Sequence, residues 1–145
     1  MSRRVPILAA AVLALAGAWA AAGDARAETR EGQGWQLEIV APPGAKAGAA
    51  AKATVVLRVR DGWKLNTEYP FKLELSPGAG AAVARPMLRK QDARRYDEHG
   101  AAIDVAITVA KAGTAEVRAT VRFATCDDAT CAPHKETFTI TATAK

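Results

Sequence analysis

The sequence predicts an all-β protein built as an antiparallel sandwich of two sheets. Hydrophobic and polar residues alternate with period two in several separate stretches, which is typical of strands with one face in a core. Turns rich in glycine and proline separate these stretches, and no stretch shows the spacing of an amphipathic helix. Short strands of this kind, with charges on their outward side, fit an immunoglobulin-like fold better than an α/β arrangement.

The predicted strands follow one another along most of the chain. In the first, the apolar side chains of Trp35, Leu37 and Ile39 alternate with polar ones. The same alternation predicts strands at residues 35–39, 55–60, 73–75, 103–109, 115–123 and 138–140. Turn-forming residues separate them at 42–44, 61–62, 76–78, 100 and 112–113, and residues 45–51 are interpreted as a loop.

The N-terminus predicts export from the cytoplasm. Arg3 and Arg4 precede an uncharged run at residues 5–23, and Ala25-Arg26-Ala27 follows it. This is the pattern of a secretory signal peptide at residues 1–27; a membrane anchor is the alternative, which the alanine-rich run and the cleavage-site motif disfavour. We therefore predict a single periplasmic domain at residues 28–145 with no stable membrane anchor.

Composition excludes several classes of protein. The net charge of +5 is too small for a dedicated nucleic-acid binder, so no nucleic-acid partner is expected. Two cysteines are too few for a multi-disulfide scaffold. A basic stretch is interpreted as a solvated loop rather than a contact surface because Gln91 and Asp92 interrupt it; its members are Arg85, Arg89, Lys90, Arg94 and Arg95.

The two cysteines lie close together near the end of the chain. Cys126 and Cys131 fall between the two last predicted strands, on the connection that joins them. A bridge between them closes a short ring, which stabilises a fold by only about 2 kcal/mol. Stability is therefore a poor reason for this placement, whereas an exposed bridge is open to attack by a partner's thiolate. A purely structural disulfide is the alternative for an exported protein.

Charged neighbours of the cysteines have opposite effects on the stability of a cysteine thiolate. Asp127 and Asp128 disfavour a thiolate on either cysteine. Arg122, His134 and Lys135 would offset these charges if the fold brings them close.

Three segments of the chain stand out as motifs: residues 61–65 (DGWKL), 126–133 (CDDATCAP) and 97–100 (DEHG). Together they resemble the N-terminal periplasmic domain of DsbD-type thiol:disulfide interchange proteins. Residues 61–65 (DGWKL) look like the D-G-aromatic-x-L segment of that family. Residues 126–133 (CDDATCAP) resemble its C-x-D-A-x-x-C-x-P segment, with one residue fewer between the cysteines. Residues 97–100 (DEHG) are similar to the loop that shields the cysteine pair, with a histidine in the place of an aromatic residue.

The resemblance implies an immunoglobulin-like domain that exchanges disulfides. Cys126 and Cys131 would be its redox couple, and Asp97, Glu98 and His99 would belong to the covering loop. Its expected partners are periplasmic thioredoxin-fold proteins and a membrane thiol reductase, so the chain would be one component of a thiol:disulfide oxidoreductase system. The alternative is a non-enzymatic binding module of the same fold, in which the bridge shapes a recognition loop.

Metal binding is a third, weaker alternative. His134 lies three residues after Cys131, so with Cys126 the sequence offers three ligands for copper or zinc. The sequence offers no obvious fourth ligand for zinc, nor a nearby second histidine and methionine for a cupredoxin-type copper centre. We therefore predict no metal and no cofactor, and interpret His134 as a surface residue that at most tunes the thiol.

Overall fold

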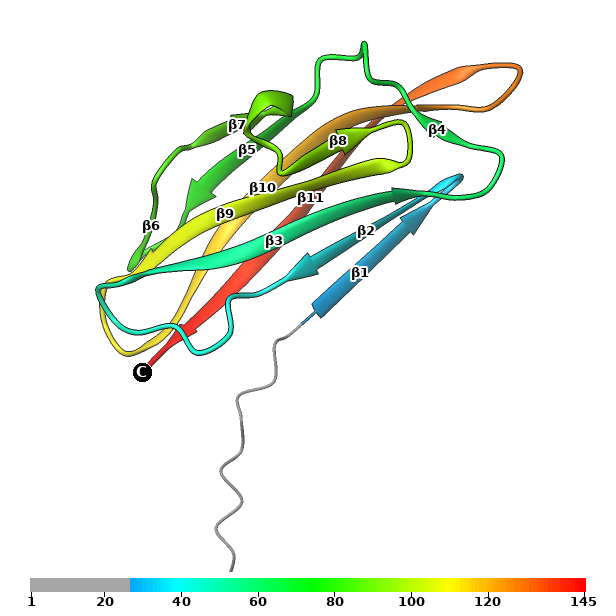
Figure 1. Cartoon of the computed structure of the whole chain (residues 1–145). Helices are drawn as coiled ribbons and strands as arrows, with labels where there is room; N and C mark the ends of the chain where they lie inside the picture. The colour runs from blue at the N-terminus through cyan, green and yellow to red at the C-terminus, as the bar shows by residue number, and fades with distance from the viewer. Residues whose placement is uncertain (1–26) are drawn as a thin grey trace, which may run out of the picture.

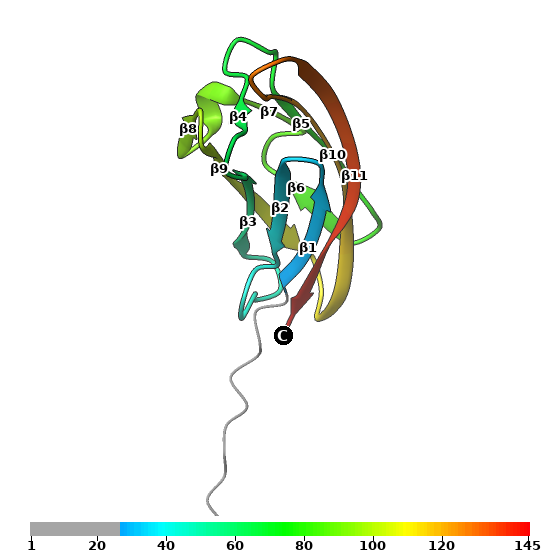
Figure 2. The ribbon, with the colours of Figure 1, turned by 90° about the vertical axis from the view of Figure 1, so that its right-hand side faces the viewer.

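The protein folds into two antiparallel sheets that face each other as an immunoglobulin-like β-sandwich, which confirms the predicted fold class (Figure 1). The computed structural model describes residues 27–145. The predicted signal peptide therefore lies outside the described residues except for Ala27, which begins the first strand. Viewed along the edges of the sheets, the two layers lie on opposite sides of the molecule, with β3 and β9 in one and β10 and β11 in the other (Figure 2).

The first layer, sheet 1, has six strands. Four of them lie in the order β1-β2-β3-β9, and both β6 and β8 pair with the free edge of β9, at opposite ends of that strand. The bounds are β1 (Ala27–Gly32), β2 (Trp35–Val40), β3 (Ala50–Val59), β6 (Ala81–Val83), β8 (Arg95–Asp97) and β9 (Gly100–Val109).

The second layer, sheet 2, has five strands. Its order is β11-β10-β5-β7, and the short β4 pairs with β10 beyond the end of β5. The bounds are β4 (Lys64–Leu65), β5 (Lys72–Pro77), β7 (Met87–Arg89), β10 (Gly113–Cys126) and β11 (Cys131–Ala144). A single turn of 3-10 helix, η1 (Lys90–Asp92), joins β7 to β8.

The core lies between the sheets because alternate residues of each long strand point inward. In β9 the inward side chains include Ile103, Val105 and Ile107, and in β10 they include Val121 and Phe123; all five are at most 1% exposed. These side chains belong to one continuous hydrophobic cluster that takes residues from both layers. Both sheets therefore share a single core.

The structure extends the predicted strands in ways that matter for the cysteines. The last two run on to form a hairpin, β10 and β11, that is paired continuously from Gly113 and Ala144 to Cys126 and Cys131. Cys126 is thus the last residue of β10 and Cys131 the first residue of β11, so the cysteines do not lie on the connection. β3 begins at Ala50, inside the segment interpreted as a loop. Among the described residues, no helix is long and apolar enough to cross a membrane.

Candidate functional site

The disulfide between Cys126 and Cys131 closes the tip of the β10–β11 hairpin. The two residues are directly opposed, and their Cα atoms lie 4.0 Å apart, as in the closer kind of antiparallel pair. Cys131 is exposed and Cys126 is half-buried. A thiolate from solvent or from a partner therefore meets Cys131 first. We call residues 126–131 the disulfide tip.

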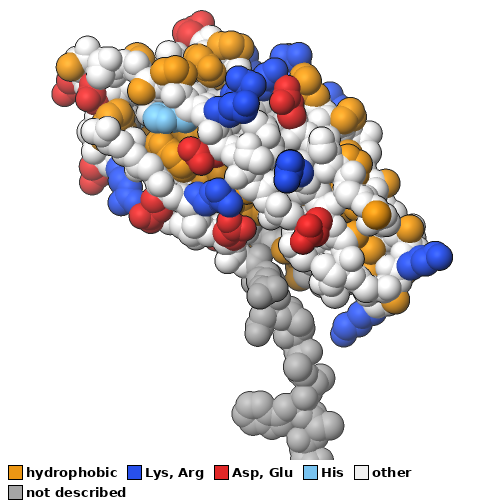
Figure 3. All heavy atoms as spheres, turned by 180° about the vertical axis from the view of Figure 1, so that it is seen from behind, with side chains coloured by type: hydrophobic (Ala, Val, Ile, Leu, Met, Phe, Trp, Pro, Cys, Tyr) orange, Lys and Arg blue, Asp and Glu red, His pale blue; other side chains and the backbone are white. Residues whose placement is uncertain are grey.

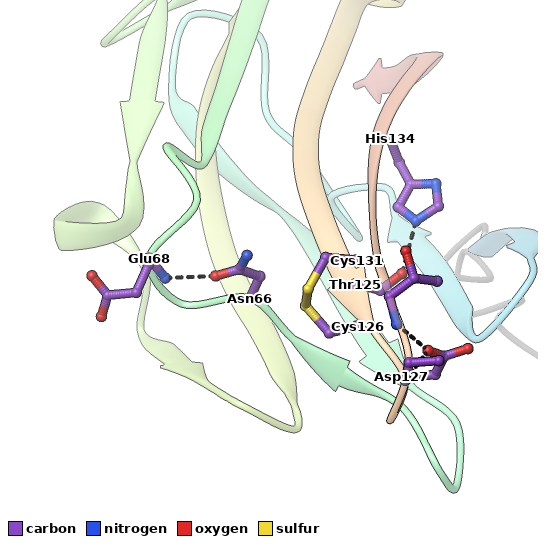
Figure 4. The surroundings of a disulfide bond; sticks show 9 residues. Asn66, Glu68, Thr125, Cys126, Asp127, Cys131 and His134 are labelled. Carbon is purple, nitrogen blue, oxygen red and sulfur yellow. Dashed lines mark hydrogen bonds between the residues drawn. A yellow bond between two sulfur atoms is a disulfide. The ribbon is translucent and has the colours of Figure 1, made fainter.

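The disulfide lies on the outer face of sheet 2. Side chains alternate along β10, and the fully buried Phe123 and Thr125 face the core, so Cys126 points away from it. Figure 4 shows the sulfur atoms on the side of the hairpin where Asn66 lies, while Thr125 and His134 lie on the other side. The bridge is thus held by the sheet without being covered by the core.

The four residues between the cysteines form a compact turn. The backbone N–H of Asp127 donates to the carbonyl of Thr130 (2.9 Å), and the Asp127 carboxylate accepts from the N–H groups of Ala129 and Thr130 (2.8 and 2.7 Å). These hydrogen bonds lower the pKa of the Asp127 carboxyl below its usual value. Asp127 is therefore a fixed negative charge next to Cys126 at neutral pH.

The DGWKL segment places β4 beside the disulfide. Trp63 packs against the β1–β2 turn, where a Cβ on Gly34 would lie 2.2 Å from the indole. The following residues then reach β10: Lys64 pairs with Cys126, and Leu65 pairs with Thr125 and enters the core. Lys64 is exposed, so one cation borders the half-buried cysteine.

The DEHG segment forms the turn between β8 and β9. The carbonyl of Glu98 accepts a hydrogen bond from the N–H of Leu65 (2.8 Å), and its carboxylate lies 3.6 Å from the Lys64 ammonium. Glu98 and His99 are exposed, and Asp97 is half-buried with its carboxylate bonded to the N–H of His99. The structure thus places the turn one strand away from Cys126, with β4 between them. Within residues 27–145, no hydrogen bond or ion pair links the side chains of this turn to the cysteines.

The connection from β4 to β5 is bonded directly to β10, the strand that carries Cys126. The N–H of Asn66 donates to the carbonyl of Ala124 (2.8 Å), and the Asn66 amide oxygen accepts from the N–H of Glu68 (3.0 Å). Ala124 is 3% exposed although it lies on the outer face. Asn66 of this connection lies on the same side of the hairpin as the sulfur atoms (Figure 4), and Lys64 is the strand partner of Cys126.

His134 lies on the inner face of β11 and is half-buried, so the prediction of a surface residue is wrong. Its ring packs against Phe123 and Trp35, with centroids 5.0 and 5.7 Å apart, and its Nε2 lies 2.8 Å from the hydroxyl of the fully buried Thr125. Burial of the ring lowers the pKa of His134, and the charge of Glu136 opposes that effect only in part. His134 therefore packs on the inner face of the hairpin, where it contacts Thr125, the residue that precedes Cys126.

The fold brings Arg122 and Lys135 side by side. They are directly opposed on the outer face, four residue pairs from the cysteines. Both charges reach Glu74, whose carboxyl pKa is lowered chiefly by a hydrogen bond and charge from Lys72 and further by Arg122 and Lys135. The outer face below the disulfide is therefore electropositive.

Two features of the site escaped prediction from sequence. Thr125 was not singled out, because its burial depends on the inward register of the whole hairpin. The proximity of Lys72 to Arg122 also escaped prediction, because it depends on how β5 pairs with β10, two strands that are far apart in the chain. Within the described residues, no group of three histidine, cysteine or acidic side chains could hold a metal ion.

Comparison with known proteins gives a likeness of fold. No family model and no curated protein matches the chain. The GAE domain of GGA2p from Saccharomyces cerevisiae is similar, with a TM-score of 0.47 and 10% identity over 79% of this chain and 97% of that one. The N-terminal periplasmic domain of ScsB from Proteus mirabilis is similar with a TM-score of 0.43 and 10% identity, over 75% of this chain and 47% of that one. A PapD-like domain of human CEP192 gives a TM-score of 0.39 and 14% identity, over 80% and 89%.

Proposed function

We propose that this protein exchanges disulfides with thioredoxin-fold partners in the periplasm, through the dithiol-disulfide pair Cys126 and Cys131. The observation that carries the proposal is the position of the bridge, which joins two directly opposed residues at the free end of a hairpin and points away from the core. The predicted signal peptide and the resemblance of the sequence to DsbD-type domains agree with it.

The exposure of the two cysteine residues gives the proposed order of events. A partner thiolate attacks the Sγ of Cys131, the exposed residue; the bond between the cysteines breaks, and Cys126 leaves as a thiolate. A second partner thiolate then attacks the partner's sulfur in the mixed disulfide and releases Cys131. Two electrons have then passed to this protein, and the partner carries the disulfide. The reverse sequence reduces a partner disulfide and restores the bridge.

The decisive experiment is a redox titration against glutathione and thioredoxin combined with trapping. We expect a reduction potential near that of thioredoxin, about −270 mV, whereas a structural bridge would lie below about −300 mV. Two matched variants test the order of attack. Cys126→Ser keeps the exposed Cys131 thiol and is expected to form mixed disulfides with a thioredoxin-fold protein faster than Cys131→Ser. The proposal is overturned if neither variant forms a mixed disulfide.

The second candidate is a binding module whose disulfide shapes a recognition loop. The hydrogen bonds that Asp127 accepts favour it, because they fix the turn at residues 127–130 independently of any redox role. For this function, a bridge that resists reduction by thioredoxin is expected. A bound partner would then be released by Asp127→Ala while the disulfide stays intact.

A further inference from the structure

A row of four cations crosses the outer face of sheet 2. The strand register sets Arg89 opposite Lys72, Lys72 opposite Arg122, and Arg122 opposite Lys135. The row therefore takes one residue from each of β7, β5, β10 and β11 at a single level of the sheet. We call these four residues the basic row. Figure 3 shows this face of the molecule, with Lys and Arg side chains gathered in its upper part.

Stability does not explain the basic row. Like charges that lie directly opposite across a sheet destabilise it. Lys72 is paired with Glu74 at 2.8 Å, but no ion pair engages Arg89, Arg122 or Lys135 within residues 27–145. The Nε of Arg122 is buried and has no hydrogen-bond partner in that part of the chain. Glu74, whose carboxyl pKa is lowered by Lys72, Arg122 and Lys135, and Asp92 beside Arg89 offset part of this charge, and the four cations leave the row with a net positive charge.

The basic row and the disulfide lie on the same face and close together. Arg122 and Cys126 are four residues apart on β10, which corresponds to roughly 13 Å along a strand. The row itself spans four adjacent strands, or roughly 14 Å. A partner covering a standard area of about 800 Å² would contact the row and the bridge at the same time.

We propose that the basic row docks an acidic surface patch of the partner protein whose thiol exchanges with the disulfide of Cys126 and Cys131. This inference rests on the proposed function and adds the chemistry by which the partner is recognised. The row attracts carboxylates and so orients the partner's thiol toward Cys131, the more exposed of the two cysteines. Partners with a neutral or basic rim around the thiol are disfavoured.

Binding is tested separately from exchange. The probes are a short fluorescent peptide rich in glutamate, with serine in place of its thiol, and a matched peptide rich in glutamine. We expect the glutamate peptide to bind more tightly, and its advantage to shrink as salt rises from about 20 to about 200 mM. Arg122→Gln with Lys135→Gln is expected to weaken its binding about three- to tenfold. Lys46→Gln with Lys111→Gln removes the same charge at exposed positions elsewhere and is expected to leave binding nearly unchanged.

Exchange is then measured with the cysteine-containing forms of the two peptides, by mass spectrometry of the mixed disulfide. We expect the glutamate peptide to react faster than the glutamine peptide. The ratio of the two rates is expected to fall in the Arg122→Gln, Lys135→Gln protein and to stay at the wild-type value in the Lys46→Gln, Lys111→Gln protein. Far-UV circular dichroism shows whether that protein is folded. If it is not, Lys135→Gln alone replaces it, because Lys135 is exposed on an edge strand.

The outcomes separate the two proposals. Charge-dependent binding without any exchange overturns the proposed function and leaves the docking surface. Exchange at equal rates with both peptides, together with equal binding, overturns the docking surface and leaves the proposed function. Tighter binding to anionic vesicles or to duplex DNA than to the glutamate peptide, lost in the same variant, also overturns the assignment to a protein partner.

Discussion

At the scale of single residues, the inner face of the hairpin carries a buried polar pair, Thr125 and His134. Thr125 is fully buried, and its hydroxyl reaches the imidazole of His134 in a part of the core otherwise filled by Phe123 and Trp35. A hydrogen bond in such surroundings matters because a buried polar atom without a partner is costly. The residue pair therefore fixes how β10 and β11 meet just below the cysteines.

We predict that Thr125→Val destabilises the protein by about 1–2 kcal/mol, since it leaves the buried side of the His134 ring without its hydroxyl partner. Urea denaturation measures the change. Thr143→Val is the matched control, because Thr143 makes a similar bond to Thr114 on the exposed face, and a change within about 0.5 kcal/mol is expected there. Equal losses in both variants would contradict the role given to Thr125.

His134 predicts a dependence of stability on pH. Its pKa in the folded protein is lowered from 6.5 by burial, so the unfolded chain binds more protons between that lowered pKa and 6.5. The contribution to stability is therefore fully present above pH 6.5 and is lost as the pH falls through this window. Urea midpoints between about pH 8 and about pH 5 are expected to fall in the wild type.

Two variants test whether His134 causes this dependence of the urea midpoint on pH. His134→Gln is expected to flatten it, and His99→Gln, which changes the exposed histidine of the β8–β9 turn, is expected to preserve it. A slope that survives in His134→Gln would show that another group carries the proton.

At the scale of elements, most of the pairing that holds the hairpin together lies outside its disulfide. The bridge joins residues only five positions apart, whereas the pairing of β10 with β11 continues from Cys126 to Gly113. β4 and β5 hold the other edge of β10. Reduction therefore removes a short ring from a hairpin that many other contacts keep in place.

We predict that the double variant Cys126→Ala, Cys131→Ala stays folded and loses only about 2 kcal/mol of unfolding free energy, as expected for so short a ring. Far-UV circular dichroism and urea denaturation check this. The wild type in excess dithiothreitol serves as the comparison and is expected to behave in the same way. Unfolding on reduction would mean that the bridge is needed for structure, which favours the binding module.

At the scale of the whole molecule, one core holds both sheets together. Leu37 of β2 and Leu73 of β5 are completely buried in different sheets and belong to the same hydrophobic cluster. We predict that Leu37→Ala and Leu73→Ala each destabilise the protein by about 2–5 kcal/mol. Tryptophan fluorescence and circular dichroism are expected to shift together in both variants, because unfolding of a small domain with one core is cooperative. Separate transitions for the two probes would contradict a single core.

The sequence predicted the fold from its central strands and missed elements at the edges. Residues 35–39, 103–109 and 115–123 alternate clearly because one face of each strand lies in the core. β1 escaped prediction because its residues are exposed or only half-buried, so no alternation marks it. β4 is two residues long and is defined by its pairing with β10, which no local pattern reveals.

The candidate site could be predicted only where residue type and spacing along the chain define it. Cys126 and Cys131 stand out through their residue type and spacing, and a disulfide joins them. The orientation of His134 and the alignment of Arg122 with Lys72 depend on strand register, which is fixed only when the two sheets close around the core.

The two-residue strand β4 ties the layers together at the end where the cysteines lie. Leu65 donates its N–H to Glu98 in the turn of sheet 1, and Asn66 donates its N–H to Ala124 in sheet 2. In the proposed exchange, a partner tethered covalently through Cys131 would pull on the free end of the hairpin while it diffuses. Because β4 and the residue after it are bonded to both layers, such a load on β10 would spread into the opposite sheet, and the hairpin would resist being peeled from the body of the molecule.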